Sequence, residues 1–523
     1  RDAGERLREN GRQEQRPKSG AHEGRTHNGP ILTYVDFLAL ICQDTAMSPQ
    51  FTRNFIVQTV GKALSVILGL FVLSLLTRSL GAEKYGAFTT AFTFLQFFGV
   101  IVDFGLTLTL VVMLSEPGAD QKKITGNVFT LRLVSAGVLF LTAPFLVLLF
   151  PWSPTVNASV AAGAMGYVFM AAAAMLVGVF QTHQNVWRAS LAELIDRVAL
   201  LAFCLYAAHK GMGAEAMMWA HTAAHAIWLA VALWFAGKFV PVRLRFDLSS
   251  WKEILRRSWP MGVSIFFNLL YLKGDILILS LFRSEAEVGN YGAAYRVLDV
   301  LTVIPTIFMG LLLPNLVRDW KQGNAVEFRQ HLARAFDAFA LMYLPVVAGA
   351  WALSVPLLRL VAGDEFIAAG GILKLLILAV PSVFLGTLYG HAVVAVDRQR
   401  TMMLGYLACA VLSLAGYFFF IPAYGMVGAA GVTIFAESFI ALTTFALVRS
   451  ASKGRPNAGV FLRAALASLL MYAVLRLLPG WHVLVLIPVG GAVYAAFLFA
   501  FGVLTPQRIR DLMPRKLAAH KPT

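Results

Sequence analysis

The chain has 523 residues, of which 58% are hydrophobic and 14% are charged, and it carries a net charge of +16 at pH 7. Because soluble proteins average about 25% charged residues, this composition excludes a soluble globular protein and indicates a polytopic membrane protein. The basic residues lie in short loops, without a basic run interleaved with aromatic residues, so we exclude nucleic acid as a partner.

The beginning of the chain differs from the rest. Residues 1–46 are polar, balance arginines against acidic residues and show no apolar period, a composition that is typical of disordered segments. The apolar stretch "ILTYVDFLALICQ" within them is too short to cross a membrane. We therefore expect 1–46 to be a disordered or artefactual N-terminal extension, and we expect a chain that starts at Met47 to insert normally.

Fourteen segments after Met47 are apolar and long enough to cross a membrane, which takes about 20 residues in a helix. In chain order they are 54–77, 86–114, 124–150, 157–180, 190–209, 213–237, 259–282, 289–317, 335–361, 366–396, 401–421, 426–448, 460–478 and 482–504. The sequence therefore predicts an all-α polytopic membrane protein with about 14 transmembrane helices. Its predicted parts are an N-lobe over 47–237, a basic cytoplasmic linker over 238–258, a C-lobe over 259–449, two further helices over 450–505 and a basic cytoplasmic tail over 506–523.

The loops between these segments differ strongly in positive charge. Loops after odd-numbered segments hold four Lys and Arg (Arg78, Lys84, Lys210 and Arg283), against 23 in the loops after even-numbered segments and the C-terminal tail. Lys and Arg accumulate on the cytoplasmic side of a membrane. We therefore expect both termini in the cytoplasm and an even number of spans.

Two of the loops resemble each other. "LLTRSLGAEKYGAFTTAFTFLQ" joins the first two predicted spans, and "SLFRSEAEVGNYGAAYRVLDVLT" joins the seventh and the eighth. Both contain an Arg-Ser pair, an acidic loop and then Tyr-Gly-Ala, with Tyr85 and Tyr291 at matching places. The two copies are six predicted spans apart. Because six is an even number, both copies cross the membrane in the same direction. The sequence therefore predicts two parallel six-helix lobes with a site between them.

Ionisable side chains inside the predicted spans are the candidate site residues, because they are costly in a membrane and usually face a bundle interior or a watery cavity. At about 1.5 Å of rise per residue, one set lies at a similar depth below the outer surface: Lys273, Asp275, Arg296, Asp299 and Lys374. A second set lies nearer the cytoplasmic side: Lys62, Asp103, Arg132 and Arg197, with Glu193 and Asp196 close by. We expect both sets to line a cavity.

Structural roles stay open for several of these residues. Arg296 and Asp299 can pair at i, i+3, whereas Lys273 and Asp275 cannot face each other at i, i+2. The charges at 193–197 are as typical of a solvated face as of a site. His221 and His225 share one helix face at i, i+4, which is a spacing of zinc ligands, but no third ligand is evident in the sequence. We therefore expect a polar stripe there, no metal site and no catalytic residue.

Five motifs resemble, in their order and spacing, one family of membrane transporters. They are "LTRSLGAEKYG", "DFGL" at 103–106, "WPMGVS", "GDILILSLFRSEAEVGNYGAAYR" and "IPAYGMVGAAGVTIFAE". The resemblance is to the polysaccharide-transporter (oligosaccharide flippase) branch of the MOP superfamily, which includes O-antigen flippases and is related to the MATE drug exporters. It covers roughly 51–450, and it depends on the whole set because no single motif defines the family.

The resemblance implies a flippase that moves a polyprenyl-diphosphate-linked oligosaccharide across the bacterial cytoplasmic (inner) membrane by alternating access, for O-antigen, exopolysaccharide or capsule synthesis. With such a substrate, we expect Arg296, Lys273 and Lys374 to hold the diphosphate. Asp275 and Asp299 would compensate these cations in the empty cavity. The implied partners are a polysaccharide polymerase and chain-length machinery. No cofactor is implied, and coupling to H⁺ or Na⁺ stays open.

Two alternatives remain. A MATE-like exporter of organic cations would have the same fold, but it would favour an acidic lumen over a basic one. A membrane polysaccharide polymerase or glycosyltransferase is disfavoured because no large outer loop could build its site. The sequence also contains no GxxxxGK[ST] motif for a built-in ATPase. We therefore expect a transporter and not an enzyme.

Overall fold

The computed structural model describes residues 49–116, 118–454 and 458–503. Over these residues the chain is almost entirely helical and contains no β-strand, as the sequence predicted. The extension expected over 1–46 and the basic tail expected over 506–523 lie outside the described residues.

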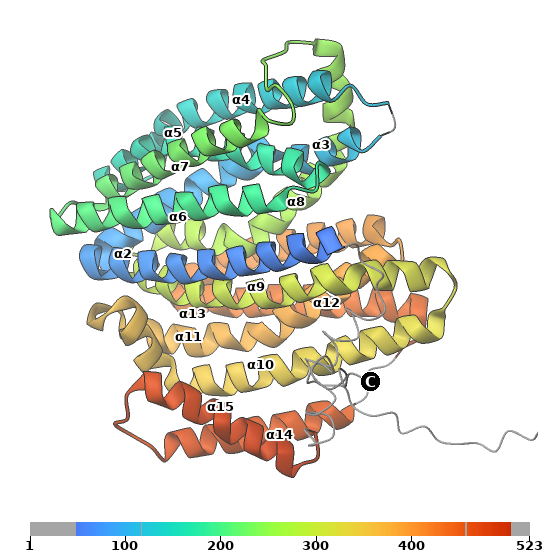
Figure 1. The fold of residues 1–523 in the computed structure, drawn as a ribbon. Helices are drawn as coiled ribbons and strands as arrows, with labels where there is room; N and C mark the ends of the chain where they lie inside the picture. The colour runs from blue at the N-terminus through green and yellow to red at the C-terminus, as the bar shows by residue number, and fades with distance from the viewer. Residues whose placement is uncertain (1–48, 117, 455–457, 504–523) are drawn as a thin grey trace, which may run out of the picture. The chain divides into compact units, whose positions relative to one another are not determined.

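Figure 1 shows the α-helices in chain order. Their bounds are α2 (Pro49–Asp103), α3 (Leu106–Leu114), α4 (Gln121–Leu146), α5 (Pro154–Thr182), α6 (Val186–His209), α7 (Ala214–Ala236), α8 (Leu248–Phe282), α9 (Glu285–Lys321), α10 (Ala325–Ala362), α11 (Ala369–Leu376), α12 (Val380–Ala395), α13 (Gln399–Ser452), α14 (Ala458–Arg476) and α15 (Val483–Ala500). Side-chain caps fix several starts. Ser153 accepts from the Val156 amide at the start of α5, and Asp247 accepts from two amides at the start of α8, because the first N–H groups of a helix have no partner within it.

Eleven helical stretches of the described residues are long and apolar enough to cross a membrane. Two of them, Val57–Leu114 and Gln399–Ser452, each contain a break at a glycine and therefore hold two predicted spans. The fifth predicted span is α6, which has the length of a span and carries Glu193, Asp196 and Arg197. The expected number of about 14 spans therefore agrees with the structure, and the count depends on how bent helices are treated.

The two breaks lie at Gly81 (φ 71°) and Gly425 (φ 55°), in a backbone region that glycine enters without a steric penalty. An arginine of the sequence repeat binds helix-end carbonyls near each break. Arg78 donates to the carbonyls of Arg359 and Leu360 at 3.2 and 2.8 Å, and Arg283 donates to those of Ile421 and Pro422 at 3.3 and 2.8 Å. These two arginines therefore join neighbouring helices.

The second leg of α2 crosses α9 at very close range. A Cβ at Gly86 would lie 1.8 Å from the carbonyl oxygen of Glu285, and a Cβ at Gly289 would lie 2.0 Å from that of Ala82. Small residues let helix backbones approach each other in membranes. The crossing thus brings the Tyr85-Gly86-Ala87 motif of the first repeat copy against the helix that carries the second copy.

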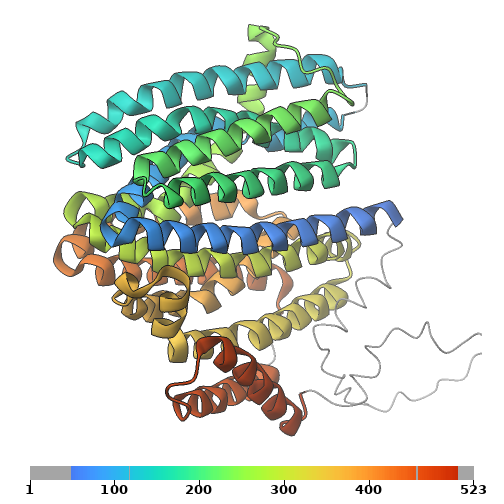
Figure 2. The same cartoon turned by 60° about the vertical axis from the view of Figure 1, so that its left-hand side comes forward.

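The last two helices lie beside α10. In Figure 2, α14 and α15 are the red helices next to the yellow α10. The Tyr494 hydroxyl on α15 donates to the Leu341 carbonyl on α10 at 3.0 Å. In the first half of the chain, α4 and α7 both pack on α5. The residue boundaries expected for the two lobes stay predictions.

Candidate functional site

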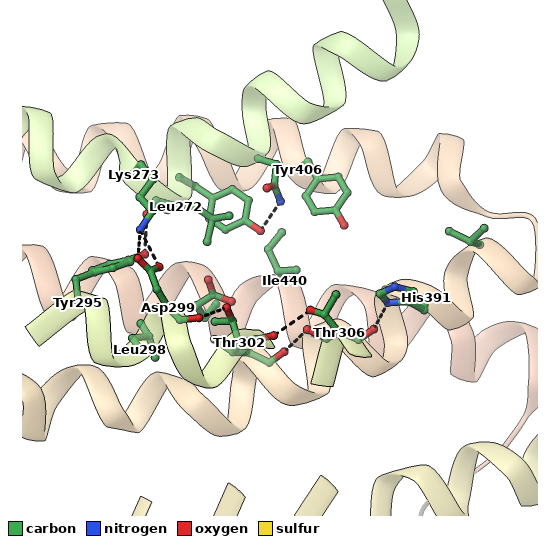
Figure 3. Close-up of a pocket in the computed structure, with 18 residues that line it drawn as sticks. Leu272, Lys273, Tyr295, Leu298, Asp299, Thr302, Thr306, His391, Tyr406 and Ile440 are labelled. Atoms are coloured by element: carbon green, nitrogen blue, oxygen red, sulfur yellow. Dashed lines mark hydrogen bonds and ion pairs between the residues drawn. The ribbon is translucent and has the colours of Figure 1, made fainter. Parts of the chain in front are cut away.

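Two of the cavities between the helices share one residue, Asp299. Cavity 1, of about 540 Å³, lies between α8, α9, α12 and α13 (Figure 3). Its polar and aromatic lining residues are Asn268, Tyr271, Lys273, Tyr295, Asp299, Thr302, Thr306, Thr387, His391, Tyr406 and Glu437. Cavity 2, of about 350 Å³, lies mainly between α2, α6, α7 and α9. Its polar and aromatic lining residues are Lys62, Ser65, Tyr85, Phe88, Phe92, Glu193, Arg197, His221, His225, Arg296 and Asp299.

The carboxylate of Asp299 is held by two cations from two different helices. Lys273 on α8 donates to both of its oxygens, at 2.8 and 3.0 Å, and Figure 3 shows the two side chains pointing at each other. Arg296 lies one turn before Asp299 on α9, and its Nη1 is 3.5 Å from Oδ2. The pair at i, i+3 therefore forms as the sequence allowed, whereas the contact with Lys273 depends on how α8 and α9 pack.

Aromatic rings support both cations. The Lys273 ammonium lies 4.0 Å from the centre of the Tyr295 ring, and the Arg296 guanidinium lies 5.0 Å from that of Phe92. Both distances are within the range of a cation–π attraction. Lys273 faces cavity 1 and Arg296 faces cavity 2. The shared carboxylate thus links a cation in one cavity to a cation in the other.

The structure places two members of the predicted outer set away from both cavities. The Asp275 carboxylate is fully buried and accepts from the Tyr291 hydroxyl at 2.6 Å, the Ile276 amide at 2.8 Å and the Thr433 hydroxyl at 3.2 Å. These bonds join α8, α9 and α13, which is a structural role. Lys374 on α11 is half-buried and lines neither cavity. These residues lie at a similar predicted depth in the membrane, but they do not line the same cavity.

Asp103 and Arg132 of the predicted inner set bind each other outside both cavities. Arg132 is 4% exposed, forms an ion pair with Asp103 and donates to the Thr107 hydroxyl at 3.1 Å and to the Ala171 carbonyl at 2.9 Å. The Thr107 hydroxyl donates to Asp103 at 2.7 Å. This network joins α2, α3, α4 and α5. A buried guanidinium needs this many partners because an unpaired charge away from water is costly.

The rest of the inner set lines cavity 2. The Lys62 ammonium lies 3.8 Å from the Glu193 carboxylate, and Arg197 lies on the same wall. The two histidines of α7 also face this cavity. His225 Nδ1 is 2.9 Å from Asp196, and His221 Nδ1 is 2.9 Å from the Met217 carbonyl. Among the residues that the structure describes, no three His, Cys, Asp or Glu side chains lie close enough to hold a metal ion.

Sequence reasoning missed most of cavity 1. Glu437 lies in the motif "IPAYGMVGAAGVTIFAE" and is only 7% exposed, yet it was not among the candidates. A single carboxyl group inside a predicted span was the available signal. For Asn268, His391 and Tyr406, no pattern in the sequence distinguished them from helix-packing residues.

Comparisons with known proteins agree with the geometry. A family model described as "Polysaccharide biosynthesis protein" matches residues 51–319. The chain is 21% identical to the probable low-salt glycan biosynthesis flippase Agl15 of Haloferax volcanii, over 68% of this chain and 74% of the relative. It is 22% identical to the succinoglycan biosynthesis transport protein ExoT of Rhizobium meliloti, over 64% and 68%. It is 25% identical to the probable lipid II flippase MurJ of the same organism, over 74% and 72%.

Solved structures show the same fold. The lipid II flippase MurJ in an inward closed conformation superposes with a TM-score of 0.73, at 17% identity, over 88% of this chain and all of that one. An inward-facing multidrug transporter of the MATE family superposes with a TM-score of 0.64, at 14% identity, over 80% of this chain and 98% of that one. At these identities the likeness concerns the fold alone.

Proposed function

The chain belongs to the polysaccharide biosynthesis protein family, and from that premise we propose that it is a flippase for a polyprenyl-diphosphate-linked oligosaccharide. The relatives support a lipid-linked glycan flippase or transporter of the MOP superfamily. The diphosphate carrier and the role in O-antigen, exopolysaccharide or capsule synthesis are the finer parts of the proposal.

The observation that carries the proposal is the cation set of cavity 2. The cations Lys62, Arg197 and Arg296 line it together with the carboxylates of Glu193 and Asp299. Asp196 lies 4.0 Å from Arg197, but it is buried and does not line the cavity. A lipid-linked sugar carries its negative charge on the diphosphate, so the basic excess suits that group. Arg296 suits it best, because the planar guanidinium can bind two phosphate oxygens at once.

The Asp299 carboxylate explains how the charge of Arg296 is compensated when no substrate is bound. Without substrate, Asp299 compensates Arg296 across 3.5 Å. When the diphosphate binds Arg296, Lys273 still donates to both oxygens of Asp299. Binding therefore leaves no buried carboxylate without a partner, which would be costly. In this revised proposal Arg296 binds the diphosphate and Lys273 holds Asp299, while Asp275 and Lys374 take no part.

Alternating access would carry the head group across while the polyprenyl tail stays in the lipid. We propose that the crossing of α2 and α9 at Gly86 and Gly289 closes one side of the pathway in this conformation and opens in the other. The protein is a multi-pass membrane protein. Its place in the bacterial cytoplasmic (inner) membrane, with both termini in the cytoplasm, and its partnership with a polymerase and chain-length machinery belong to the proposal.

A second function has one observation in its favour. Glu437 gives cavity 1 an acidic group, as a MATE-like exporter of organic cations would need. We place this second because cavity 2 is basic and because three relatives are named as flippases or as a transport protein of glycan synthesis. Those names also support a protein without enzymatic activity.

Reconstituted translocation tests the proposal. Proteoliposomes that contain the full chain and a labelled polyprenyl-diphosphate oligosaccharide should lose label from one leaflet, as an impermeant glycan-modifying reagent would report. A labelled organic cation should not move faster than in liposomes without protein. If the organic cation moves and the lipid-linked oligosaccharide does not, the protein is an exporter of organic cations and the flippase proposal is wrong.

A further inference from the structure

Cavity 1 has chemistry that differs from that of cavity 2. Its cation, Lys273, is already compensated by Asp299. The other acidic residue on its wall is Glu437, and Lys273 is its single Lys or Arg, so the cavity carries no basic excess. A second diphosphate site here is therefore disfavoured. With about 540 Å³, the cavity lies within the range of about 300–1,000 Å³ that small-molecule sites occupy.

Much of the free hydrogen-bonding capacity of cavity 1 consists of acceptors. The hydroxyls of Thr302, Thr306 and Thr387 donate to backbone carbonyls at 2.7, 2.9 and 2.8 Å, which leaves their lone pairs for a ligand. His391 Nδ1 lies 2.8 Å from the Thr387 carbonyl, which can only accept. Nδ1 therefore carries a proton, and Nε2 is the ring nitrogen left for a ligand. Such a wall suits a ligand that is rich in donors.

Glu437 strengthens this conclusion. Its side chain on α13 is 93% buried, since 7% is exposed, and it lines the cavity. Within the described part of the chain, no hydrogen bond or ion pair within 4.0 Å is recorded for it. The oxygens of a carboxyl group accept hydrogen bonds, and a buried polar group without a partner is costly. Glu437 is thus poised to accept from a ligand.

Aromatic rings lie beside these acceptors. The Tyr271 and Tyr406 rings are nearly parallel, at 7°, with centres 6.4 Å apart. Asn268 donates to the Tyr271 hydroxyl at 2.9 Å, which fixes that phenol at the cavity wall. The C–H faces of a sugar ring pack on aromatic rings, while its hydroxyls donate hydrogen bonds around the rim. A hydroxyl-rich ring therefore fits both parts of the lining.

Cavity 1 also continues toward the start of α13. A neighbouring cavity of about 510 Å³ shares Asn268, Gly390, Val394 and Tyr406 with it and reaches Gln399 and Arg400. Arg400 is exposed. A chain of sugars that begins beside Asp299 thus has room to extend along α12 and α13.

We propose that cavity 1 binds the first sugar of the lipid-linked glycan, and that this sugar is an uncharged hexose or hexosamine whose hydroxyls donate to Glu437. The inference rests on the proposed function, because the diphosphate in cavity 2 would place the sugar next to Asp299, which both cavities share. An acidic sugar is rejected, because its carboxylate brings acceptors and a negative charge to a wall that holds Glu437.

The test uses the full chain in lipid nanodiscs and three probes with the same polyprenyl tail: polyprenyl diphosphate, polyprenyl diphosphate glucose and polyprenyl diphosphate glucuronate. The Kd of the glucose probe should be about tenfold lower than that of the bare diphosphate, and the glucuronate probe should gain nothing. Glu437→Ala should remove the gain for glucose and leave the Kd of the bare diphosphate unchanged. Glu437→Gln should keep part of that gain and admit glucuronate. Glu215→Ala, an exposed glutamate on α7, is the matched control and should bind like the wild type.

The outcomes separate this inference from the proposed function. Equal affinity of the wild type for glucose probe and bare diphosphate would overturn the sugar site and leave the flippase proposal standing. Failure to bind any of the three probes would count against both. A Na⁺-dependent change in Kd that is the same for all probes and disappears in Glu437→Ala would assign Glu437 to a cation and overturn the sugar site. Size-exclusion profiles identify variants that misfold. If Glu437→Ala misfolds, the Kd of Glu437→Gln for the glucuronate probe decides whether Glu437 contacts the sugar.

Discussion

The Lys273 ammonium donates to both carboxylate oxygens of Asp299, at 2.8 and 3.0 Å, and this bond joins α8 to α9 at the place where the two cavities meet. The same carboxylate lies 3.5 Å from Arg296. One acid therefore serves two bases, and the base with the longer contact is the one that faces the basic cavity. This arrangement leaves Arg296 the more available of the two for a phosphate.

The bond between Lys273 and Asp299 should contribute measurably to stability. The two side chains are 15% and 31% exposed, and charged groups that lose a partner in such surroundings destabilise a protein. In a double-mutant cycle of Lys273→Met and Asp299→Asn, we expect a coupling energy of about 1–3 kcal/mol, measured by unfolding in detergent. The more exposed pair of Lys62 and Glu193, at 3.8 Å, is the matched control and should give less than about 1 kcal/mol. Equal coupling in both pairs would contradict the assignment.

The crossing of α2 and α9 should tolerate no side chain at Gly86. A Cβ there would lie 1.8 Å from a backbone carbonyl oxygen, so Gly86→Val must push the helices apart. We expect a lower Tm and a changed pattern of disulfide cross-linking between cysteines introduced on α2 and α9. Gly137→Ala on α4 is the control, because a Cβ there would meet nothing within 4 Å, and alanine is the better helix former. A Tm for Gly86→Val at or above that of the control would show that the crossing is not close-packed.

Arg132 and Arg296 should differ in what their loss affects. Arg132 is bonded to Asp103, Thr107 and a carbonyl, and it lines neither cavity. Arg132→Met should therefore lower stability by about 3–5 kcal/mol, while the protein that does fold should bind polyprenyl diphosphate with an unchanged Kd. Arg296→Met should do the reverse. The membrane level, the Tm and the Kd of each variant test this difference. Weaker binding of polyprenyl diphosphate by well-folded Arg132→Met would show that Arg132 belongs to the binding site.

Asp247, which begins α8 outside the membrane span, gives a prediction about pH. Hydrogen bonds from Ser249, Lys123 and Ser250 hold the pKa of its carboxyl below the ordinary value. Because the folded-state pKa is depressed, the stabilisation is present above the ordinary carboxyl pKa of about 4 and is lost as pH falls through the folded-state pKa. We expect Asp247→Ala to lower the Tm at pH 7, and the difference from the wild type to shrink below about pH 4. A difference that stays constant with pH would contradict this.

The sequence predicted the fold well because a membrane leaves few choices. Three features can be recognised directly in the sequence: apolar runs long enough to span a membrane, the positive charge of the loops, and the repeated Tyr-Gly-Ala motif. The site was less predictable. Depth along a helix placed Lys273, Asp275 and Lys374 together, but the direction of a side chain around the helix depends on which neighbours pack against it. Asp275 thus faces Tyr291 and Thr433 instead of the cavity.

The contact between Lys273 and Asp299 illustrates the same limit. These residues are 26 positions apart on different helices, and no spacing rule within one helix relates them. The i, i+3 pair of Arg296 and Asp299 could be predicted because one helix fixes it. Most of cavity 1 was missed because its wall combines Asn268, His391 and Tyr406 from three helices, and nothing in the sequence distinguishes these residues from helix-packing residues.

The most direct test of the account is translocation of a labelled polyprenyl-diphosphate oligosaccharide by Arg296→Ala in proteoliposomes. Loss of a bidentate, charge-assisted contact costs about 1.5–3 kcal/mol per hydrogen bond, so the account predicts a rate at least about tenfold below the wild type at equal protein content. Arg296→Lys should recover part of that rate. Arg463→Ala, an exposed arginine on α14 outside both cavities, should translocate like the wild type. A well-folded Arg296→Ala that moves the lipid-linked glycan at the wild-type rate would contradict the central claim.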